Sequence, residues 1–216
     1  MKKDRTMIKN AMLLYAVTDR AWLHGRTLKD CVEQSLKGGV TFLQIREKEL
    51  DEKTFEQEAR ELKELAKQYQ VSFVVNDDIE IAKKIDADGV HVGQSDMACQ
   101  KAREVLGEEK IIGVSARTVE EAKKAEEDGA DYIGVGAMFS TSTKEDAKEI
   151  TREEIEAIRK AVTIPIVGIG GIHEGNVLWL KGTGIDGIAV VSAIYGAEDI
   201  QKASEKLLAL SKQMIE

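Results

Sequence analysis

Short apolar runs alternate with longer segments of helical period along almost the whole chain. The runs are rich in Val, Ile and Leu, and most are bounded by Gly, Asp or Asn, which is typical of buried strands. We predict strands at residues 13–18, 41–46, 72–76, 89–93, 110–115, 131–136, 164–170 and 186–192.

The segments between the predicted strands carry apolar residues at helical spacing. They predict helices at residues 28–38, 52–69, 119–129 and 152–161. Several of these helices end in a glycine just before the next strand, as a C-terminal cap would. The related stretches DADGV, DGADYIGV and GIDGIAV recur along the chain and indicate a repeated unit.

Strands that are apolar throughout and are separated by helices are typical of a parallel sheet covered on both faces. Eight such strands in 216 residues, without a Pro/Gly/Ser-rich linker, favour one closed (β/α)8 TIM barrel over two domains. A doubly wound open sheet is the alternative. We expect the barrel to span residues 13–216 and residues 1–12 to form an N-terminal extension that is frayed or packs on it. In either fold, ligand groups gather at the carboxyl ends of the strands.

Composition narrows the class of protein. With 43% hydrophobic and 32% charged residues, the chain is expected to fold as a packed globule. Its net charge of −8 argues against a nucleic-acid partner, which would require an excess of Lys and Arg. Cys31 and Cys99 lack a Cys-x-x-Cys spacing and are expected to be reduced and buried.

No targeting or membrane segment is predicted. The apolar runs are shorter than the roughly 18 residues that a membrane helix needs. The first residues place basic groups before an apolar stretch, but that stretch stops at Thr18, Asp19 and Arg20 and fits a first strand better than a signal peptide. We therefore expect a cytoplasmic protein with no membrane partner.

Polar residues and glycines gather at the ends of nearly every predicted strand and directly after them. In chain order these residues are Gln44, Ile45, Arg46, Glu47 and Lys48; Asn76, Asp77 and Asp78; His91, Gly93, Gln94, Ser95 and Asp96; Ser115 and Arg117; Thr141, Ser142, Thr143 and Lys144; Gly170 and Gly171; and Val191 and Ser192.

The last two groups favour a phosphate site. Glycines at 170 and 171 allow backbone N–H groups to approach a ligand closely, and barrels of this kind often bind phosphate after the seventh and eighth strands. Val191 and Ser192 begin the last helical region, whose N-terminus favours an anion. The alternative is a tight turn followed by an ordinary helix cap.

Asp77 and Asp96 each follow an apolar strand, and the two strands are expected to be neighbours. Two converging carboxylates repel unless a cation joins them, and oxygen ligands suit Mg²⁺, which commonly bridges carboxylates to substrate phosphates. The alternative is a pair of solvated loop acids. Asp78 fits better as a cap of the helix that follows it.

Arg46, Lys48 and Lys144 supply local positive charge in an acidic protein. Arg offers a planar fork to phosphate and Lys a compact charge. Each could be a solvated surface charge, but three of them at strand ends, beside two acids and a hydroxyl cluster, favour a diphosphate site.

These motifs together resemble the thiamine-phosphate synthase (thiamine-phosphate pyrophosphorylase) family. The resemblance covers the chain from about Leu13 to the last helix and is carried by QIREK, VVND, GVHVGQSD, IGVSA, DYIGVGAMFSTSTKEDA, IVGIGGI and DGIAVVSAI. It implies a (β/α)8 barrel that joins 4-amino-2-methyl-5-hydroxymethylpyrimidine diphosphate to hydroxyethylthiazole phosphate, with Mg²⁺, giving thiamine phosphate and pyrophosphate.

The resemblance also implies roles for particular residues. The pyrimidine diphosphate would be held by Gln44, Ile45, Arg46, Glu47, Lys48, Asn76, Ser115 and Lys144. The thiazole phosphate would be held by Thr141, Ser142, Thr143, Gly171, Val191 and Ser192. Mg²⁺ would be held by Asp77 and Asp96, and the catalytic groups would be Lys144, Arg46, Lys48 and Ser115.

The sequence departs from the family pattern at three positions and leaves some questions open. Ala137 and Ser140 stand where proline is common, and Arg117 stands where histidine is common. His91 could contact substrate, or its ring nitrogens could form their hydrogen bonds within the core. The alternatives to a synthase are a thiazole tautomerase-like enzyme and a non-catalytic regulator that binds thiamine phosphates. A homodimer is compatible with the resemblance.

Overall fold

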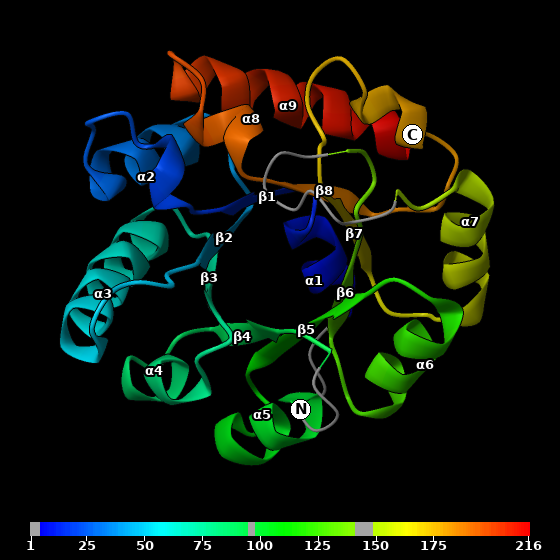
Figure 1. Ribbon diagram of the computed structural model, residues 1–216, viewed down its shortest axis with the longest axis horizontal. Helices are drawn as coiled ribbons and strands as arrows, with labels where there is room; N and C mark the ends of the chain where they lie inside the picture. Colours follow the sequence, from blue (N-terminus) through cyan, green and yellow to red (C-terminus); the bar gives the residue numbers. More distant parts are fainter. Residues whose placement is uncertain (1–4, 95–97, 141–148) are drawn as a thin grey trace.

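The computed structural model describes residues 5–94, 98–140 and 149–216. Eight parallel strands close into a barrel in chain order, and β8 pairs with β1 (Figure 1). This closure confirms the predicted (β/α)8 barrel and excludes the open sheet. The strands are β1 (Leu14–Val17), β2 (Phe42–Ile45), β3 (Ser72–Asn76), β4 (Gly89–Val92), β5 (Ile111–Ala116), β6 (Tyr132–Val135), β7 (Ile166–Ile169) and β8 (Gly187–Val190).

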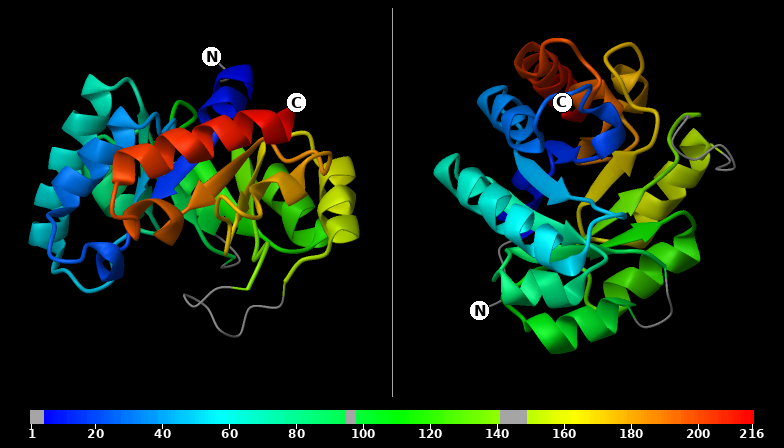
Figure 2. Two further views of the ribbon diagram at one scale, coloured as in Figure 1. Left: turned by 90° about the horizontal axis from the view of Figure 1, so that it is seen from above. Right: turned by 60° about the vertical axis from the view of Figure 1, so that its left-hand side comes forward.

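Helices form a layer around the barrel, as the side views of Figure 2 show. They are α1 (Arg5–Ala11), α2 (Leu28–Lys37), α3 (Glu52–Gln68), α4 (Ile79–Lys84), α5 (Ala98–Leu106), α6 (Val119–Glu127), α7 (Arg152–Ala161), α8 (Ser192–Tyr195) and α9 (Ile200–Ile215). Two 3₁₀ helices, η1 (Arg20–Trp22) and η2 (Val177–Leu180), lie in the connections after β1 and β7.

The four predicted helices agree with α2, α3, α6 and α7 to within two residues at either end. These helices start where they do because each is preceded by a capping residue, Thr27, Asp51, Thr118 or Thr151, whose side chain accepts a hydrogen bond from the first turn. Asp78 caps α4 in the same way, accepting from the Ile81 N–H at 2.8 Å, so its predicted role as a cap is confirmed.

Most predicted strands run slightly past the observed ones, whereas β3 agrees at both ends and β5 is displaced by one residue. The largest differences are at 164–170, where β7 spans Ile166–Ile169, and at 186–192, where β8 spans Gly187–Val190. Pro165 lacks the N–H that a ladder needs at the start of β7. At the other end, Gly170 adopts φ +98°, which takes the chain out of the sheet.

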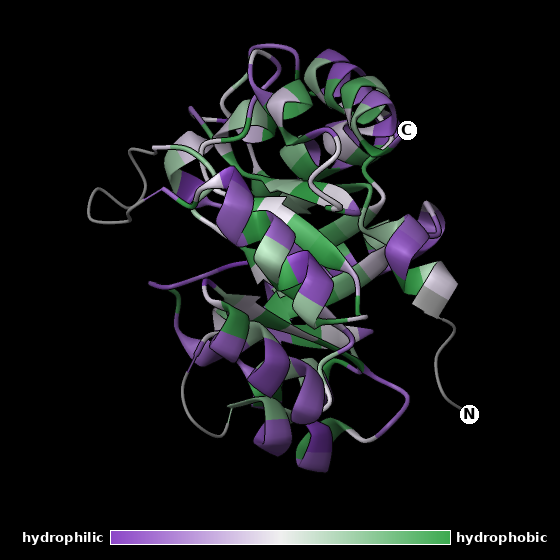
Figure 3. Cartoon of the chain, turned by 90° about the vertical axis from the view of Figure 1, so that its right-hand side faces the viewer, coloured by the Kyte–Doolittle hydropathy of each residue, from purple (hydrophilic) through white to green (hydrophobic). Residues whose placement is uncertain are grey.

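The apolar core has two parts. The larger fills the space between the barrel and its helices, and the smaller fills the barrel itself. Inside the barrel the rings of Tyr15, Phe42 and Tyr132 pack edge to face, with centroids 4.6 to 6.0 Å apart. The colouring of Figure 3 shows the apolar strands within and the polar helix faces outside.

Helix α1 closes the amino end of the barrel. It lies at the centre of the ring of strands in Figure 1, and Ile8 and Met12 are buried in the interior cluster. Lys9 forms an ion pair with Asp186, just before β8, at 3.0 Å. The described part of the N-terminal extension is therefore packed on the barrel, and the barrel interior is accessible from the opposite end.

Both cysteines are free and buried, as predicted. Burial raises the pKa of the Cys99 thiol to about 11. Within the described ranges, no helix is long and apolar enough to cross a membrane.

Candidate functional site

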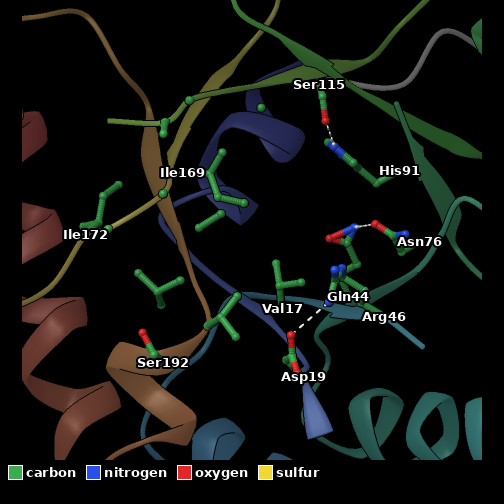
Figure 4. A pocket seen from close by; sticks show the side chains of 18 of the residues that line it. Val17, Asp19, Gln44, Arg46, Asn76, His91, Ser115, Ile169, Ile172 and Ser192 are labelled. Carbon is green, nitrogen blue, oxygen red and sulfur yellow. Dashed lines mark hydrogen bonds and ion pairs between the residues drawn. The ribbon is translucent and has the colours of Figure 1, made fainter. Parts of the chain in front are cut away.

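A cavity of about 260 Å³ opens at the carboxyl end of the barrel, opposite α1 (Figure 4). Residues from all eight strands or the turns that follow them line it, because the carboxyl ends of parallel strands meet at one edge. The lining residues are Val17, Asp19, Gln44, Arg46, Asn76, His91, Ser115, Ala116, Arg117, Gly134, Gly136, Ala137, Ile169, Gly170, Gly171, Ile172, Ala189, Val190, Val191 and Ser192.

One wall of the cavity consists of polar side chains from β1, β2 and β3. The Arg46 guanidinium donates through Nη1 to Asp19 Oδ2 at 2.9 Å, and both side chains are mostly buried. The Arg46 backbone N–H donates to Thr18 Oγ1 at 2.9 Å, which ties the end of β2 to the end of β1. Beside them, Gln44 Nε2 donates to Asn76 Oδ1 at 3.3 Å. Held in this way, Arg46 directs a planar cation at the cavity.

Asp77 lies at the rim, on the exposed turn after β3. Its carboxylate accepts a hydrogen bond from Asn76 Nδ2 at 2.7 Å, and its backbone N–H donates to the His91 carbonyl at 2.8 Å. Its φ is +60°, a left-handed conformation that is uncommon outside glycine and is best tolerated by Asp and Asn. Cross-strand bonding therefore fixes this carboxylate in a defined place.

His91 and Ser115 line the cavity above this wall. His91 Nε2 lies 3.0 Å from Ser115 Oγ, and His91 Nδ1 lies 2.9 Å from the Tyr132 hydroxyl. Burial lowers the pKa of His91 to about 4, although the Asp77 charge opposes the shift. The imidazole is thus neutral at physiological pH. It lines the cavity, and its Nδ1 is hydrogen-bonded to the buried Tyr132, so the alternative of a histidine satisfied by the core is confirmed and contact with substrate stays a prediction.

On the opposite wall, the backbone of the turn after β7 lines the cavity together with the side chains of Ile169 and Ile172 (Figure 4). Gly170 and Gly171 have φ values of +98° and +66° after β7. A Cβ on Gly171 would lie 2.7 Å from the carbonyl oxygens of Phe139 and Ser140, so the close approach of two chain segments requires glycine there. Asn176 Nδ2 donates to the Gly171 carbonyl at 2.9 Å and holds the turn in place.

Val191 and Ser192 complete this wall, but the helix that they begin is shorter than expected. It is α8, a single turn over Ser192–Tyr195, and the long final helix α9 starts at Ile200. A one-turn helix adds little macrodipole. An anion on this wall would depend on individual backbone N–H groups and the Ser192 hydroxyl.

Four predicted site residues in the described ranges are not in the cavity lining. Ile45 is fully buried between the barrel and its helices. Glu47 pairs with Arg20 at 2.9 Å, its Oε1 is buried and has no hydrogen-bond partner among the described residues, and burial raises the pKa of Glu47. Lys48 is exposed on the loop after β2, and Asp77 occupies the rim. Their predicted contacts with substrate stay predictions.

The remaining predicted residues, Asp96, Thr141, Ser142, Thr143 and Lys144, lie outside the described residues. Over the described ranges, no three His, Cys, Asp or Glu side chains cluster as a ready-made metal site.

The positions that depart from the family pattern lie at the same edge of the barrel. Arg117 and Ala137 line the cavity. The Arg117 backbone N–H donates to Glu121 Oε2 at 2.6 Å, and the Ser140 backbone N–H donates to Glu149 Oε1 at 2.6 Å.

Sequence reasoning missed Asp19 and the apolar lining residues Ile169 and Ile172. Asp19 directly follows the predicted strand 13–18, so naming the residues at this strand end, as at the later ones, would have included it. Ile169 and Ile172 gave no separate signal, because an isoleucine that faces the cavity and one that faces the helices look alike in sequence.

Comparison with known proteins agrees with this arrangement. The family model described as thiamine monophosphate synthase matches residues 14–194. The thiamine-phosphate synthase of Clostridium tetani is 49% identical over 90% of this chain and 93% of its own, and that of Ruminiclostridium cellulolyticum is 51% identical over the same shares. The solved thiamine phosphate pyrophosphorylase of Pyrococcus furiosus superposes with a TM-score of 0.89 at 38% identity, covering 97% of this chain and 100% of that one. The chain therefore belongs to the thiamine monophosphate synthase family.

Proposed function

We propose that this cavity joins 4-amino-2-methyl-5-hydroxymethylpyrimidine diphosphate to hydroxyethylthiazole phosphate, releasing thiamine phosphate and pyrophosphate. The observation that carries the proposal is the pairing of a cationic side-chain wall with a backbone glycine wall across one cavity. Two phosphorylated substrates need two anion sites that face each other across the bond to be formed. Membership of a family of transferases supports the same reaction.

The side-chain wall would bind the pyrimidine diphosphate. Breaking the C–O bond to the diphosphate leaves a pyrimidine methylene cation, which the ring amino group stabilises. Negative charge grows on the departing diphosphate as that bond stretches. Arg46, together with Lys48 and Lys144, would therefore bind the transition state more strongly than the substrate, and this difference lowers the barrier.

The backbone wall would bind the thiazole phosphate. Gly171, Val191, Ser192 and the hydroxyls of residues 141–143 would hold its phosphate as a remote handle and place the thiazole nitrogen near the cation. That nitrogen is already a neutral nucleophile, so no general base is required. The neutral state of His91 is compatible with this requirement.

The residues at the rim fit Mg²⁺. Asp77 presents an exposed carboxylate held by Asn76, and an all-oxygen donor set completed by substrate phosphate and water suits this ion. We propose that Asp77 and Asp96 hold it. When bound, Mg²⁺ would neutralise charge on the diphosphate.

The alternatives are less well supported. A thiazole tautomerase has no diphosphate to bind, so the fixed cation of Arg46 and the rim carboxylate of Asp77 would have no purpose there. A non-catalytic regulator is disfavoured by the curated synthases that align over most of their length. A cytoplasmic location and a homodimer remain predictions.

The test is to incubate the purified protein with both precursors and assay thiamine phosphate, with and without a metal chelator. We expect product that depends on metal. Product at full rate without metal would refute the roles of Asp77 and Asp96, and the absence of product in all conditions would refute the synthase.

A further inference from the structure

A chain of four polar side chains crosses the otherwise apolar interior of the barrel. Starting from the closed amino end, the Tyr15 hydroxyl lies 2.9 Å from the Tyr132 hydroxyl, and the latter lies 2.9 Å from His91 Nδ1. The chain ends at the cavity, where His91 Nε2 lies 3.0 Å from Ser115 Oγ. Figure 4 shows the last link, with Ser115 and His91 pointing toward each other at the cavity edge.

Strand register and two glycines make room for this chain. His91 on β4 pairs with Gly113 on β5, which in turn pairs with Tyr132 on β6. A Cβ on Gly113 would lie 2.1 Å from the Tyr132 ring, so glycine alone lets the tyrosine reach across β5 to the histidine. Gly134 pairs with Ser115 and likewise leaves space for the His91 imidazole. A Cβ added at this position would lie 3.2 Å from His91 Cε1.

The direction of these hydrogen bonds follows from the environment of Tyr15, the buried end of the hydrogen-bonded series. The Tyr15 side chain is fully buried, and within the described ranges its hydroxyl has one hydrogen-bond partner, Tyr132. If the bonds ran from Ser115 towards Tyr15, the Tyr15 O–H would be left without an acceptor, at a cost of about 1–3 kcal/mol. In the opposite direction every buried donor is satisfied.

We propose that Tyr15 and Tyr132 are positioning residues that fix His91 as the Nε2–H tautomer and thereby turn Ser115 into a directed donor. Tyr15 donates to Tyr132, Tyr132 donates to His91 Nδ1, and Nε2–H donates to Ser115 Oγ. The Ser115 proton is then the one left to point into the cavity, where it suits an anionic phosphate oxygen of the substrate. The choice of ligand rests on the proposed function, whereas the tautomer and its cause do not.

The first test needs no activity. Nitrogen NMR of the imidazole rings distinguishes the two tautomers, and with three histidines in the chain the His91 signals can be assigned by comparison with a His91→Gln variant. We expect a protonated Nε2 and an unprotonated Nδ1 in the unaltered protein, and a loss of this preference in Tyr132→Phe. A protonated Nδ1 in the unaltered protein would overturn the proposal.

The second test asks whether Tyr132 acts through Ser115. We expect Tyr132→Phe to lower kcat/KM about tenfold in the unaltered background. In a Ser115→Ala background the same change should have an effect within about twofold, because the group through which it acts is gone. Equal losses in both backgrounds would indicate general damage to the fold and would refute the positioning role.

Tyr195→Phe is the matched control. Tyr195 is another fully buried tyrosine, and its hydroxyl lies 3.4 Å from Ser35 Oγ, away from the chain of Tyr15, Tyr132 and His91. It should leave the His91 ring signals unchanged and kcat/KM within about twofold. If the enzyme forms no thiamine phosphate at all, the proposed function fails, and the NMR result still decides the tautomer.

Discussion

The two walls of the cavity are built to hold anions in different ways. On one side, Arg46 is a long side chain held by an ion pair with Asp19 at 2.9 Å. On the other, Gly170 and Gly171 expose backbone at φ values that side chains disfavour. The first wall provides the positive charge of the Arg46 guanidinium, which attracts a ligand more strongly as negative charge develops on that ligand. The second provides fixed dipoles that suit a ligand whose charge is constant.

This difference suggests a division of labour. Contacts that strengthen as a bond breaks raise kcat, whereas contacts that are equal in substrate and transition state mainly change KM. The side-chain wall should therefore control turnover and the backbone wall should control affinity for the second substrate. Each of the following experiments can confirm or break that contrast.

Removal of the proposed Mg²⁺ should have the largest effect, and it should act on the side-chain wall alone. With a chelator present we expect turnover to fall roughly 10³-fold, because several kcal/mol of charge stabilisation are lost. Binding of the thiazole phosphate alone, measured by calorimetry, should be unchanged. A weaker thiazole phosphate affinity in chelator would show that the ion serves both walls.

Arg46→Ala should lower kcat about 10²-fold with a small change in the KM for thiazole phosphate, because one fixed cation facing the diphosphate is lost. Steady-state kinetics with each substrate varied in turn would measure both constants. Arg46→Lys is the matched control, and it should recover only part of the loss since Lys offers a point charge and no fork. An unchanged kcat in Arg46→Ala would place the diphosphate elsewhere.

Gly171→Ala should act on the backbone wall with the opposite signature. The new Cβ would meet two carbonyl oxygens at 2.7 Å at a φ of +66°, so the turn must shift. We expect the KM for thiazole phosphate to rise about tenfold while kcat changes little. Gly175→Ala, in the same connection but facing only the His173 side chain, should keep a normal KM. Equal effects of the two variants would contradict the assignment.

Asp19→Asn sharpens the contrast within the side-chain wall. It keeps the shape but removes the charge that holds Arg46, so we expect kcat to fall about fivefold through poorer positioning. In an Arg46→Ala background, Asp19→Asn should cause no further fall in kcat. Losses that simply add would mean that Asp19 acts independently of Arg46.

Ser192→Ala should have the smallest effect, about twofold in the KM for thiazole phosphate, since the backbone N–H groups at the start of α8 remain. Kinetic assay of this variant beside Gly171→Ala gives the comparison. A larger loss in Ser192→Ala than in Gly171→Ala would mean that this wall also depends on side chains.

Much of the fold was predictable because its signals are local. The apolar runs predicted the strands, and apolar residues at helical spacing predicted the helices between them. The helix starts are also locally determined, because the side chains of Thr27, Asp51, Thr118 and Thr151 each cap only the first turn that follows. The errors lie at strand ends and in α8, where tertiary contacts decide how far regular structure continues.

The site was predictable in part for a similar reason. Since parallel strands end at one edge, naming the residues at the end of each strand located Gln44, Arg46, Asn76 and Ser115 in one cavity. The same rule could not say that Ile45 turns outward or that Glu47 pairs with Arg20. The direction of a side chain depends on the tilt of its strand relative to the barrel axis and on neighbouring residues that are distant in sequence.

The sequence by itself determined the number and order of the strands, the helix starts and the edge at which polar groups gather, because each follows from residue type and short-range spacing. The tertiary structure alone decided which groups meet. Tyr15 and Tyr132 are far apart in the chain, and they come within 2.9 Å only because barrel closure and the register through Gly113 bring their strands together. Contacts of that kind arise from packing between distant segments, which no local pattern records.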